Sequence, residues 1–224
     1  MSGERMIVDG AAFVDTAVNW IVSAMQSILQ ERGVCHLMLA GGGTPMPIYR
    51  SMATLDLPWG DLKLYFGDER CVPSDHSDSN YRAVTESLFP HGIPENLELH
   101  RMRGEDDPDL AALEYEGLLP DRIDILLLGM GGDGHTASLF PGSPALNESN
   151  RRVLPVIGSK PPPRRLSITP LVIHSARKVL VLAEGGNKAD AVHRALEVGD
   201  VPVALASKGD WLMDRAAASA LADG

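Results

Sequence analysis

The residues best suited to catalysis lie in one glycine-rich segment, residues 123–142, which reads IDILLLGMGGDGHTASLFPG. Its apolar start, residues 125–128, has the continuous pattern of a strand that is buried on both faces of a parallel sheet. Asp133 and His135 follow inside a glycine turn, at the carboxyl end of the strand, where open α/β sheets bind their ligands. An imidazole held there by local groups can act as a general base near neutral pH.

Two other interpretations of this turn compete with the catalytic one. Gly129, Gly131 and Gly134 satisfy G-x-G-x-x-G, the fingerprint of dinucleotide binding. Asp133 argues against that interpretation because it places a carboxylate where a pyrophosphate would lie, and residues 150–178 contain no Asp or Glu to bind a ribose. The plainer alternative is a tight turn whose histidine is only a structural hydrogen-bonding group.

A second glycine turn predicts an anion site. A buried strand over residues 34–40 runs into the sequence GGGTP (residues 41–45), in which Thr44 suits a helix N-cap and Pro45 the first helical position. Free backbone N–H groups at such a helix start attract anions. The Gly-Lys-Ser/Thr ending of a nucleotide P-loop is missing, so a smaller anion is expected, with a turn that binds no ligand as the alternative.

Charged residues follow two further strands. Asp68 and Arg70 come directly after a strand at residues 62–66. The alternative to a functional role is an ordinary solvated loop, since loops are where charged residues are common. After the strand at residues 178–183, the sequence GGNK (residues 185–188) opens a helix with Lys188 in its first turn, where the helix dipole opposes a cation unless an anion binds beside it. The segment with Asp75, His76 and Asp78 matches no metal-ligand spacing, so a hydrated polar loop is preferred there.

These turns require a framework of alternating strands and helices. Helices are expected at residues 11–31, closed by Gly33 as C-cap, at 80–89 with Ser79 as N-cap, and at 109–119; further strands are expected at 153–157 and 178–183. The alternation predicts an α/β fold, a single domain over residues 1–224 with a doubly wound, mostly parallel sheet and helices on both faces. Residues 136–138 are expected to start a short helix, 201–206 to form a last strand, and 211–221 a closing helix.

The composition limits the class of protein. The chain has 224 residues, of which 44% are hydrophobic and 22% charged, as is ordinary for a globular domain. The net charge of -10 argues against nucleic acid or an anionic membrane as partner. The two cysteines, Cys35 and Cys71, offer no disulfide framework, and neither a signal peptide nor an apolar run of membrane-spanning length is evident. We therefore expect a cytoplasmic protein that is a monomer or a weak dimer.

Five loops together carry a resemblance to a known family. The sequences GGGTP, GDERCVP, SDSNYR, GMGGDGHTASLFPG and GGNK, in this order, resemble those of the family of 6-phosphogluconolactonases and glucosamine-6-phosphate deaminases. The resemblance spans residues 41–196. It implies a Rossmann-like, deaminase-like fold, a small sugar-phosphate lactone as substrate, and no metal or organic cofactor.

The resemblance also implies roles for individual residues. His135 matches the catalytic histidine of the family and Asp133 its acidic partner, while Asp68 stands where the deaminases carry a proton-transferring carboxylate. Which of Asp133 and Asp68 orients the histidine is left open. The residues that match the binding site for the substrate phosphate are Gly42, Gly43, Thr44, Arg70 and Lys188. Arg164 and Arg165 resemble a basic strand start of the family, but neither can be assigned a role.

Two departures from the deaminase pattern favour a lactonase. Phe140 replaces the acidic residue that follows the Asp-Gly-His motif in deaminases, and Arg70 replaces a tyrosine. The expected reaction is therefore hydrolysis of 6-phosphogluconolactone by general-base activation of water. The alternatives are a glucosamine-6-phosphate deaminase and a non-catalytic sugar-phosphate sensor, and the presence of His135 counts against the sensor.

Overall fold

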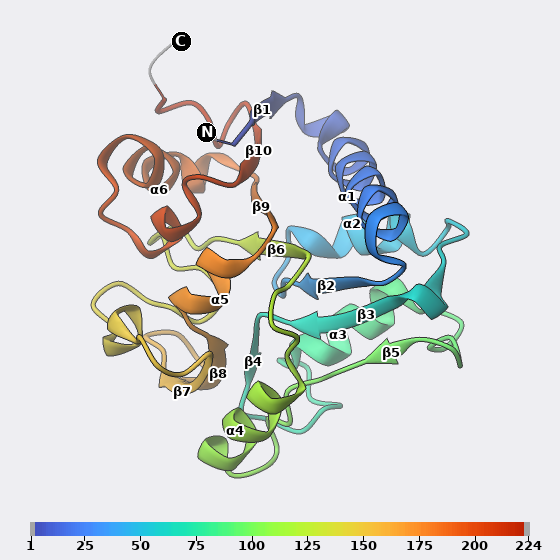
Figure 1. The fold of residues 1–224 in the computed structure, drawn as a ribbon. Coiled ribbons are helices and arrows are strands. Elements are labelled where there is room, and N and C mark those ends of the chain that lie inside the picture. The colour runs from blue at the N-terminus through green and yellow to red at the C-terminus, as the bar shows by residue number, and fades with distance from the viewer. Residues whose placement is uncertain (1–2, 222–224) are drawn as a thin grey trace.

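A seven-stranded parallel sheet forms the centre of the computed structural model, which describes residues 3–221 (Figure 1). Every pair of neighbouring strands in this sheet is parallel. In spatial order the strands are β1 (Arg5–Val8), β10 (Asp210–Asp214), β9 (Lys178–Ala183), β6 (Ile125–Gly129), β2 (Cys35–Leu39), β3 (Leu62–Phe66) and β5 (Glu98–Leu99).

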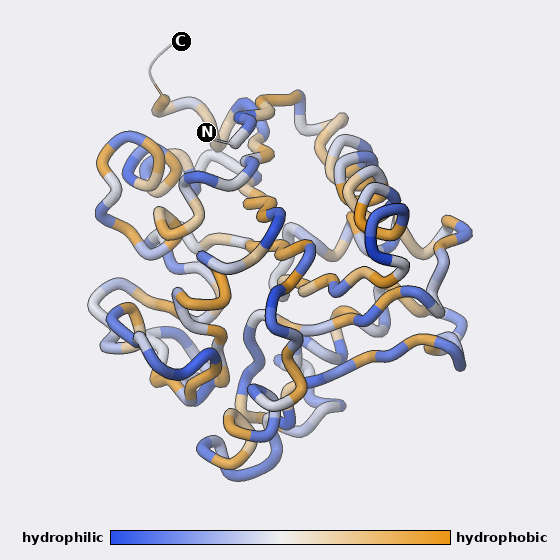
Figure 2. Tube along the Cα trace, viewed as in Figure 1, coloured by the Kyte–Doolittle hydropathy of each residue, from blue (hydrophilic) through white to orange (hydrophobic). Residues whose placement is uncertain are grey.

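Helices cover both faces of the sheet, as the sequence predicted. The helices α1 (Gly10–Arg32), α2 (Pro45–Met52) and α3 (Asn80–Leu88) pack on one face, and α4 (Pro108–Leu118), α5 (Pro170–Ser175) and α6 (Ala189–His193) on the other. One hydrophobic core lies on each face of the sheet, and alternate residues of each strand point into one core or the other. In β6, Leu127 faces the core beneath α1 and Leu126 the core beneath α4. Figure 2 shows the resulting concentration of apolar residues along the central strands.

Helix α1 shows how the sequence determines its own packing. Phe13, Ala17, Ile21 and Met25 repeat every four residues and are buried against the sheet. Gly33 closes the helix in the left-handed conformation, with φ of 71°, and donates its N–H to the carbonyl of Leu29. Within the described residues α1 is the one helix long and apolar enough to cross a membrane, but its apolar face is the one that packs in the core.

A second, smaller sheet was not expected. The strands β4 (Asp68–Arg70), β8 (Arg164–Ile168) and β7 (Val153–Ile157) pair antiparallel in that order. The strand β4 follows β3 after Gly67 alone, so the chain turns from the large sheet into the small one next to its charged residues. Short helical turns complete the fold: η1 (Trp59–Asp61), η2 (Pro144–Asn147), η3 (Gly186–Lys188), η4 (Arg194–Val198) and η5 (Pro202–Ala206).

Three predicted elements are wrong. Residues 202–206 form the helical turn η5, and residues 210–214 form the strand β10 in place of a helix. Trp211 and Met213 are buried on one face of the sheet and Leu212 on the other, a period of two that packing between β1 and β9 enforces. Residues 136–138 form a tight turn, bridged from Thr136 to Leu139, because Ala137 adopts a φ of 47° that no right-handed helix allows. The edge strand β1 was not predicted.

The order of the strands places a ligand site between β2 and β6. From β2 the sheet grows outward through β3 and β5, and from β6 it grows in the opposite direction through β9 and β10. The connections after β2 and β6 therefore diverge and leave a crevice at the carboxyl ends of the strands. Both glycine turns singled out in the sequence lie at this point.

The opposite end of β6 contains a buried charge that predicts a stability effect. Asp124 is 0% exposed, accepts a 2.9 Å hydrogen bond from the backbone N–H of His36, and lies within 3.3 Å of the Nε atoms of Arg32 and Arg177. Asp124→Asn removes the charge that these cations face, and since both arginines can reach solvent, the free energy of unfolding should fall by about 2 kcal/mol.

Urea denaturation measures this loss, and Asp9→Asn is the matched control. The Asp9 pair with Arg215 is exposed on both sides, so its removal should cost under about 0.5 kcal/mol. Equal stability of the two variants would show that the buried cluster around Asp124 contributes nothing.

Candidate active site

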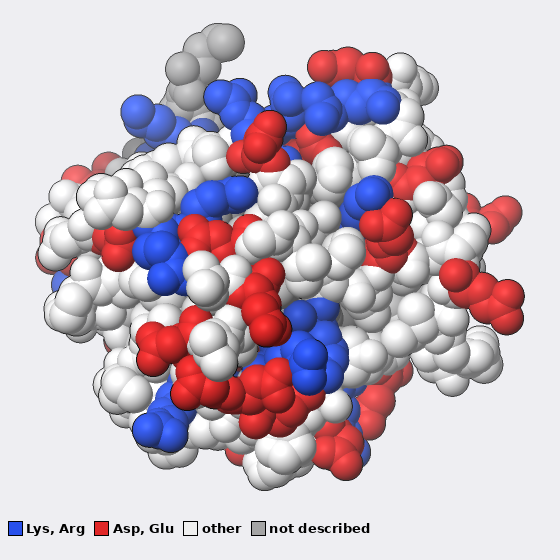
Figure 3. Space-filling view, turned by 60° about the horizontal axis from the view of Figure 1, so that its bottom comes forward, with Lys and Arg blue, Asp and Glu red and all other residues white. Residues whose placement is uncertain are grey.

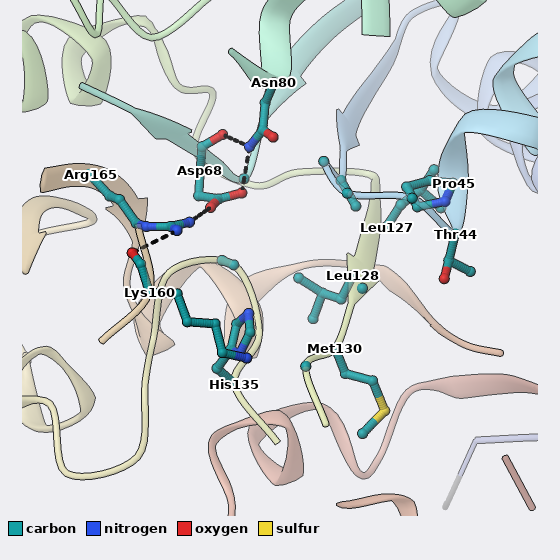
Figure 4. Close-up of a pocket in the computed structure, with 18 of the residues that line it drawn as sticks. Thr44, Pro45, Asp68, Asn80, Leu127, Leu128, Met130, His135, Lys160 and Arg165 are labelled. Carbon is teal, nitrogen blue, oxygen red and sulfur yellow. Dashed lines mark hydrogen bonds and ion pairs between the residues drawn. The ribbon is translucent and has the colours of Figure 1, made fainter. Parts of the chain in front are cut away.

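The crevice contains a pocket of about 260 Å³ that gathers most of the predicted site residues (Figure 4). The glycine turn after β2 forms one wall, β4 and α3 another, and the turn after β6 a third. The predicted residues that line it are Gly42, Gly43, Thr44, Asp68, Arg70, His135 and Lys188. Asp133 is not part of the lining, but its carboxylate contacts the ring of His135.

His135 and Asp133 form a hydrogen-bonded pair. His135 Nδ1 lies 2.5 Å from Asp133 Oδ1, which leaves Nε2 as the nitrogen available to a ligand. Gly131 permits this arrangement, since a Cβ at that position would lie 2.1 Å from His135 Nδ1 and 2.3 Å from Asp133 Oδ1. The carboxylate in contact with the imidazole is therefore Asp133 and not Asp68, a choice that the sequence left open.

The surroundings keep the two members of the pair in opposite protonation states. Partial burial opposes ionisation of Asp133, but the hydrogen bond and charge of His135, with Lys160, lower its pKa to about 2. Burial, aided by the charge of Lys160, lowers the pKa of His135 even though Asp133 opposes this shift. At neutral pH Asp133 is thus a carboxylate that accepts the proton on Nδ1, and Nε2 has a free lone pair.

Phe140 and Arg165 support the imidazole from the side. The Phe140 ring stacks on His135 with centroids 4.5 Å apart and an angle of 25° between the rings. The guanidinium carbon of Arg165 lies 5.5 Å from the centre of the same Phe140 ring. Because both Phe140 and Arg165 are buried, the imidazole plane has little freedom to turn.

Asp68 belongs to a separate hydrogen-bond network. Its carboxylate accepts hydrogen bonds from Ser138 Oγ at 2.6 Å and from Asn80 Nδ2 at 3.1 Å, and Arg165 Nη1 lies 4.0 Å away. Asn80 also packs against the first glycine turn, since a Cβ on Gly41 would lie 2.1 Å from its Oδ1. Asp68 therefore links three walls of the pocket.

Glu69 fixes β4 to the start of α3. Its buried carboxylate accepts hydrogen bonds from the backbone N–H groups of Arg70, Asn80 and Tyr81 and from the hydroxyl of Ser79. These N–H groups at the helix start would otherwise lack acceptors. Glu69 thereby holds the backbone from which Asp68 and Arg70 reach the pocket, and Ser79 caps α3 as predicted by accepting from the N–H of Arg82.

Two guanidinium groups, those of Arg70 and Arg165, line the pocket. Arg70 Nη1 donates to the carbonyl of Asp78 at 2.6 Å, but its buried Nε has no hydrogen-bond partner among the described residues. Burial, together with the charge of Arg70, lowers the pKa of Arg165, with Asp68 acting in the opposite direction. Because the two positive charges repel each other, an anion that binds beside them would be favoured.

The two neighbouring arginines of β8, Arg164 and Arg165, lie in different surroundings. Residues alternate between the faces of a strand, and Arg165 is 5% exposed in the pocket wall while Arg164 is exposed outside it. This alternation is invisible in a single sequence whose register is unknown. Lys160 was not among the residues singled out from the sequence, but it lines the pocket, and its Nζ lies 3.3 Å from Asp133 Oδ1.

The glycine turn after β2 differs from the prediction in one detail. Pro45 is the first residue of α2, but Thr44 has helical φ and ψ of -60° and -42°, and its side chain forms no capping hydrogen bond. The predicted cap is therefore wrong, and the Thr44 hydroxyl lies at the pocket (Figure 4). Gly42, with φ of 89°, has the left-handed conformation that lets the turn bend toward the ligand site.

Lys188 completes the cationic lining from the other side. It ends η3, immediately before α6, and burial with the nearby charge of Lys160 lowers its pKa, while Asp133 opposes the shift. On the face shown in Figure 3, Lys and Arg form small groups that Asp and Glu border. A small anion would therefore be attracted by side chains that line the pocket and not by the overall charge of -10.

Among residues 3–221, no group of three or more His, Cys, Asp or Glu side chains is arranged to hold a metal ion. In the polar loop considered above, His76 Nδ1 lies 3.7 Å from Asp78 Oδ2, and both side chains are half exposed. Independence from metals stays a prediction.

The fold and pocket define an α/β protein whose strand switch point holds a histidine–carboxylate pair in a pocket lined with cations. A family model described as glucosamine-6-phosphate isomerases/6-phosphogluconolactonase matches residues 8–213. The chain belongs to this family.

Individual relatives are similar over almost their whole length. A 6-phosphogluconolactonase from Mycobacterium tuberculosis is 37% identical in an alignment 245 residues long that covers 98% of each chain. The crystal structure of 6-phosphogluconolactonase from Thermotoga maritima has a TM-score of 0.86 at 28% identity and covers 95% of this chain and 99% of its own. A monomeric glucosamine-6-phosphate deaminase is also similar, with a TM-score of 0.80 at 26% identity, covering 97% and 99%. The predicted doubly wound fold is confirmed.

Proposed function

We propose that this chain hydrolyses 6-phospho-D-glucono-1,5-lactone to 6-phospho-D-gluconate, a step of the oxidative pentose phosphate pathway. The observation that carries the proposal is the His135–Asp133 pair, whose free Nε2 borders a pocket lined with cations. The names of the similar proteins support the same reaction. A cytoplasmic location and a monomeric or weakly dimeric state belong to the proposal.

The proposed mechanism begins with His135 as general base. A lactone carbonyl is already electrophilic, so neutral imidazole can take a proton from water as the water oxygen attacks C1, and no serine or cysteine nucleophile is required. Backbone N–H groups of the glycine turn would stabilise the tetrahedral oxyanion. Collapse of this intermediate breaks the bond between C1 and the ring oxygen, which takes the proton back from His135. The product acid then ionises and releases one proton to solvent.

The basic side chains would bind the phosphate at the far end of the substrate. Arg70 has a buried Nε without a partner among residues 3–221, and burial lowers the pKa of Lys188, so both side chains gain when an anion enters. Gly42, Gly43 and Thr44 would contribute polar groups of the first turn. Arg165 joins this set as an addition from the structure.

Deamination of glucosamine 6-phosphate is the second candidate. It is favoured by the likeness to the deaminase fold and by Asp68, a carboxylate in the pocket lining. Against it, Asp68 is engaged by Ser138 and Asn80, and a phenylalanine, Phe140, stacks directly on His135 where the resemblance places an acid in deaminases.

One assay separates these candidates. Purified protein is added to freshly made 6-phosphogluconolactone, and acid release is followed above the spontaneous rate, while ammonia release from glucosamine 6-phosphate is measured in parallel. Rapid acid release without ammonia is expected. Ammonia production without lactone hydrolysis would reassign the chain to the deaminases.

Turnover should survive exhaustive chelation. The proposed steps use only side chains and backbone groups of this chain, so dialysis against a strong chelator should leave kcat within about twofold of the untreated value. Metal content before and after dialysis is the control. Loss of activity that a single added metal restores would contradict the mechanism.

A further inference from the structure

Residues 158–163 connect β7 to β8 and form one rim of the pocket; we call this segment the strap. Its two ends meet through a 2.7 Å hydrogen bond from the N–H of Gly158 to the carbonyl of Pro163. A Cβ on Gly158 would lie 2.6 Å from Phe140 Cε2, so the strap packs directly on the ring that stacks on His135. The middle of the strap presents Lys160 to the pocket.

Arg165 holds the strap in place through hydrogen bonds to its backbone. Its Nε donates to the carbonyl of Pro162 at 2.9 Å, and its Nη2 lies 3.2 Å and 3.3 Å from the carbonyls of Lys160 and Pro161. One buried guanidinium thus holds three consecutive carbonyls (the bond to Lys160 is drawn in Figure 4). The backbone that carries Lys160 is therefore fixed relative to the floor of the pocket.

Lys160 and His135 share one oxygen atom. Lys160 Nζ lies 3.3 Å from Asp133 Oδ1, the same atom that lies 2.5 Å from His135 Nδ1. A carboxylate that already faces an ammonium group gains less from a second positive charge, and the ammonium repels an imidazolium directly. The contact therefore favours the neutral imidazole without removing the hydrogen bond that orients it.

Other charges near the imidazole come from every wall of the pocket. Asp133 and Asp68 favour its protonation, and Lys160 opposes it. Lys188 lies near Lys160 and Asp133, and Arg165 stands behind Phe140. Of the cations, Lys160 is the one in contact with the carboxylate partner of His135.

We propose that Lys160 is a positioning residue, which holds the Asp133 carboxylate in place and keeps His135 unprotonated in mildly acidic solution. The proposal rests on the proposed function of His135 as general base. The lowered pKa of His135, for which burial is the first cause and Lys160 a contributing one, points in the same direction. Lys160 was assigned no role by the sequence, and its action here is on the base and not on the phosphate.

The test is the pH profile of Lys160→Met. Methionine keeps most of the volume of the side chain and removes its charge. Because the Lys160 side chain is 48% exposed and its charge is screened, the acid limb of the kcat/KM profile should move to higher pH by about half a unit, with the plateau at higher pH lowered less than threefold. Lys160→Arg should restore the limb. Arg164→Met removes an exposed cation outside the pocket and should leave the profile unchanged.

Two outcomes would overturn the proposal. One is an unchanged acid limb in Lys160→Met and in Lys160→Gln. The other is a rise in KM for the phosphorylated lactone with the limb unmoved, which would make Lys160 a phosphate ligand.

A second readout does not depend on turnover. NMR titration of the His135 ring should show its pKa raised in Lys160→Met by the same amount as the kinetic limb. If the wild type fails to hydrolyse the lactone, the proposed function fails, whereas the titration still decides whether Lys160 controls the charge of His135.

Discussion

His135→Ala should lower kcat by about 10²-fold or more and leave KM nearly unchanged, because the lost group acts as charge develops in the transition state. The imidazole is held by Asp133 on one nitrogen and by the Phe140 ring on its face, so the wild-type base is already aligned for water. Alanine keeps the fold of the turn but removes the proton acceptor. Steady-state kinetics on freshly made lactone, corrected for spontaneous hydrolysis, measure the effect.

Protonation of His135 should also determine the pH below which the wild-type enzyme loses activity. His135 must be neutral to act, and its pKa is lowered by burial, so activity should persist below the ordinary histidine value of about 6.5. His91→Ala, which changes an exposed histidine in a loop, is the control and should alter neither kcat nor the limb. A His135→Ala enzyme with near wild-type kcat would eliminate the general-base assignment.

Arg70→Ala and Lys188→Ala should mainly raise KM, whereas His135→Ala should mainly lower kcat. They remove charged contacts to a phosphate remote from the reacting carbon, contacts that exist in both the ground state and the transition state. KM for the phosphorylated lactone should therefore rise by about 10- to 100-fold for each substitution, the range expected for a hydrogen bond to a charged group. Some loss of kcat is expected as well if the lactone leaves its aligned position.

The decisive measurement is the ratio of kcat/KM for the phosphorylated lactone to kcat/KM for the unphosphorylated one. The wild type should strongly prefer 6-phosphogluconolactone to unphosphorylated gluconolactone, and the two variants should discriminate much less. Lys208→Ala, an exposed lysine outside the pocket, serves as the control for lost positive charge. Unchanged binding of the phosphorylated lactone by both basic variants would refute the phosphate assignment, even in an active lactonase.

The sequence predicted what depends on local pattern. Continuous apolar runs located β6 and β9, the four-residue repeat located α1, and glycine turns after β2 and β6 identified the edge where the pocket forms. Each of these features is determined by neighbours within a few residues. The topological rule for parallel sheets then sufficed to bring Gly42 and His135 together.

What escaped prediction depends on distant partners. β10 is a strand because β9 and β1 lie on either side of it, although its own short pattern also fits a helix. Lys160 and Arg165 acquire their positions from the small antiparallel sheet, whose register decides which arginine is buried. None of these outcomes is encoded within a single segment.

The pairing of β1 with β10 has a consequence for how the chain is made. Arg5 lies opposite Trp211 in the sheet, so β1 has no partner strand until more than two hundred further residues have been synthesised. Contacts so distant in sequence form late and slowly. Until then β9 presents an open edge to which other chains can add. A nascent or truncated chain that lacks β10 should therefore aggregate or engage chaperones even though its pocket residues, up to Lys188, have all been made.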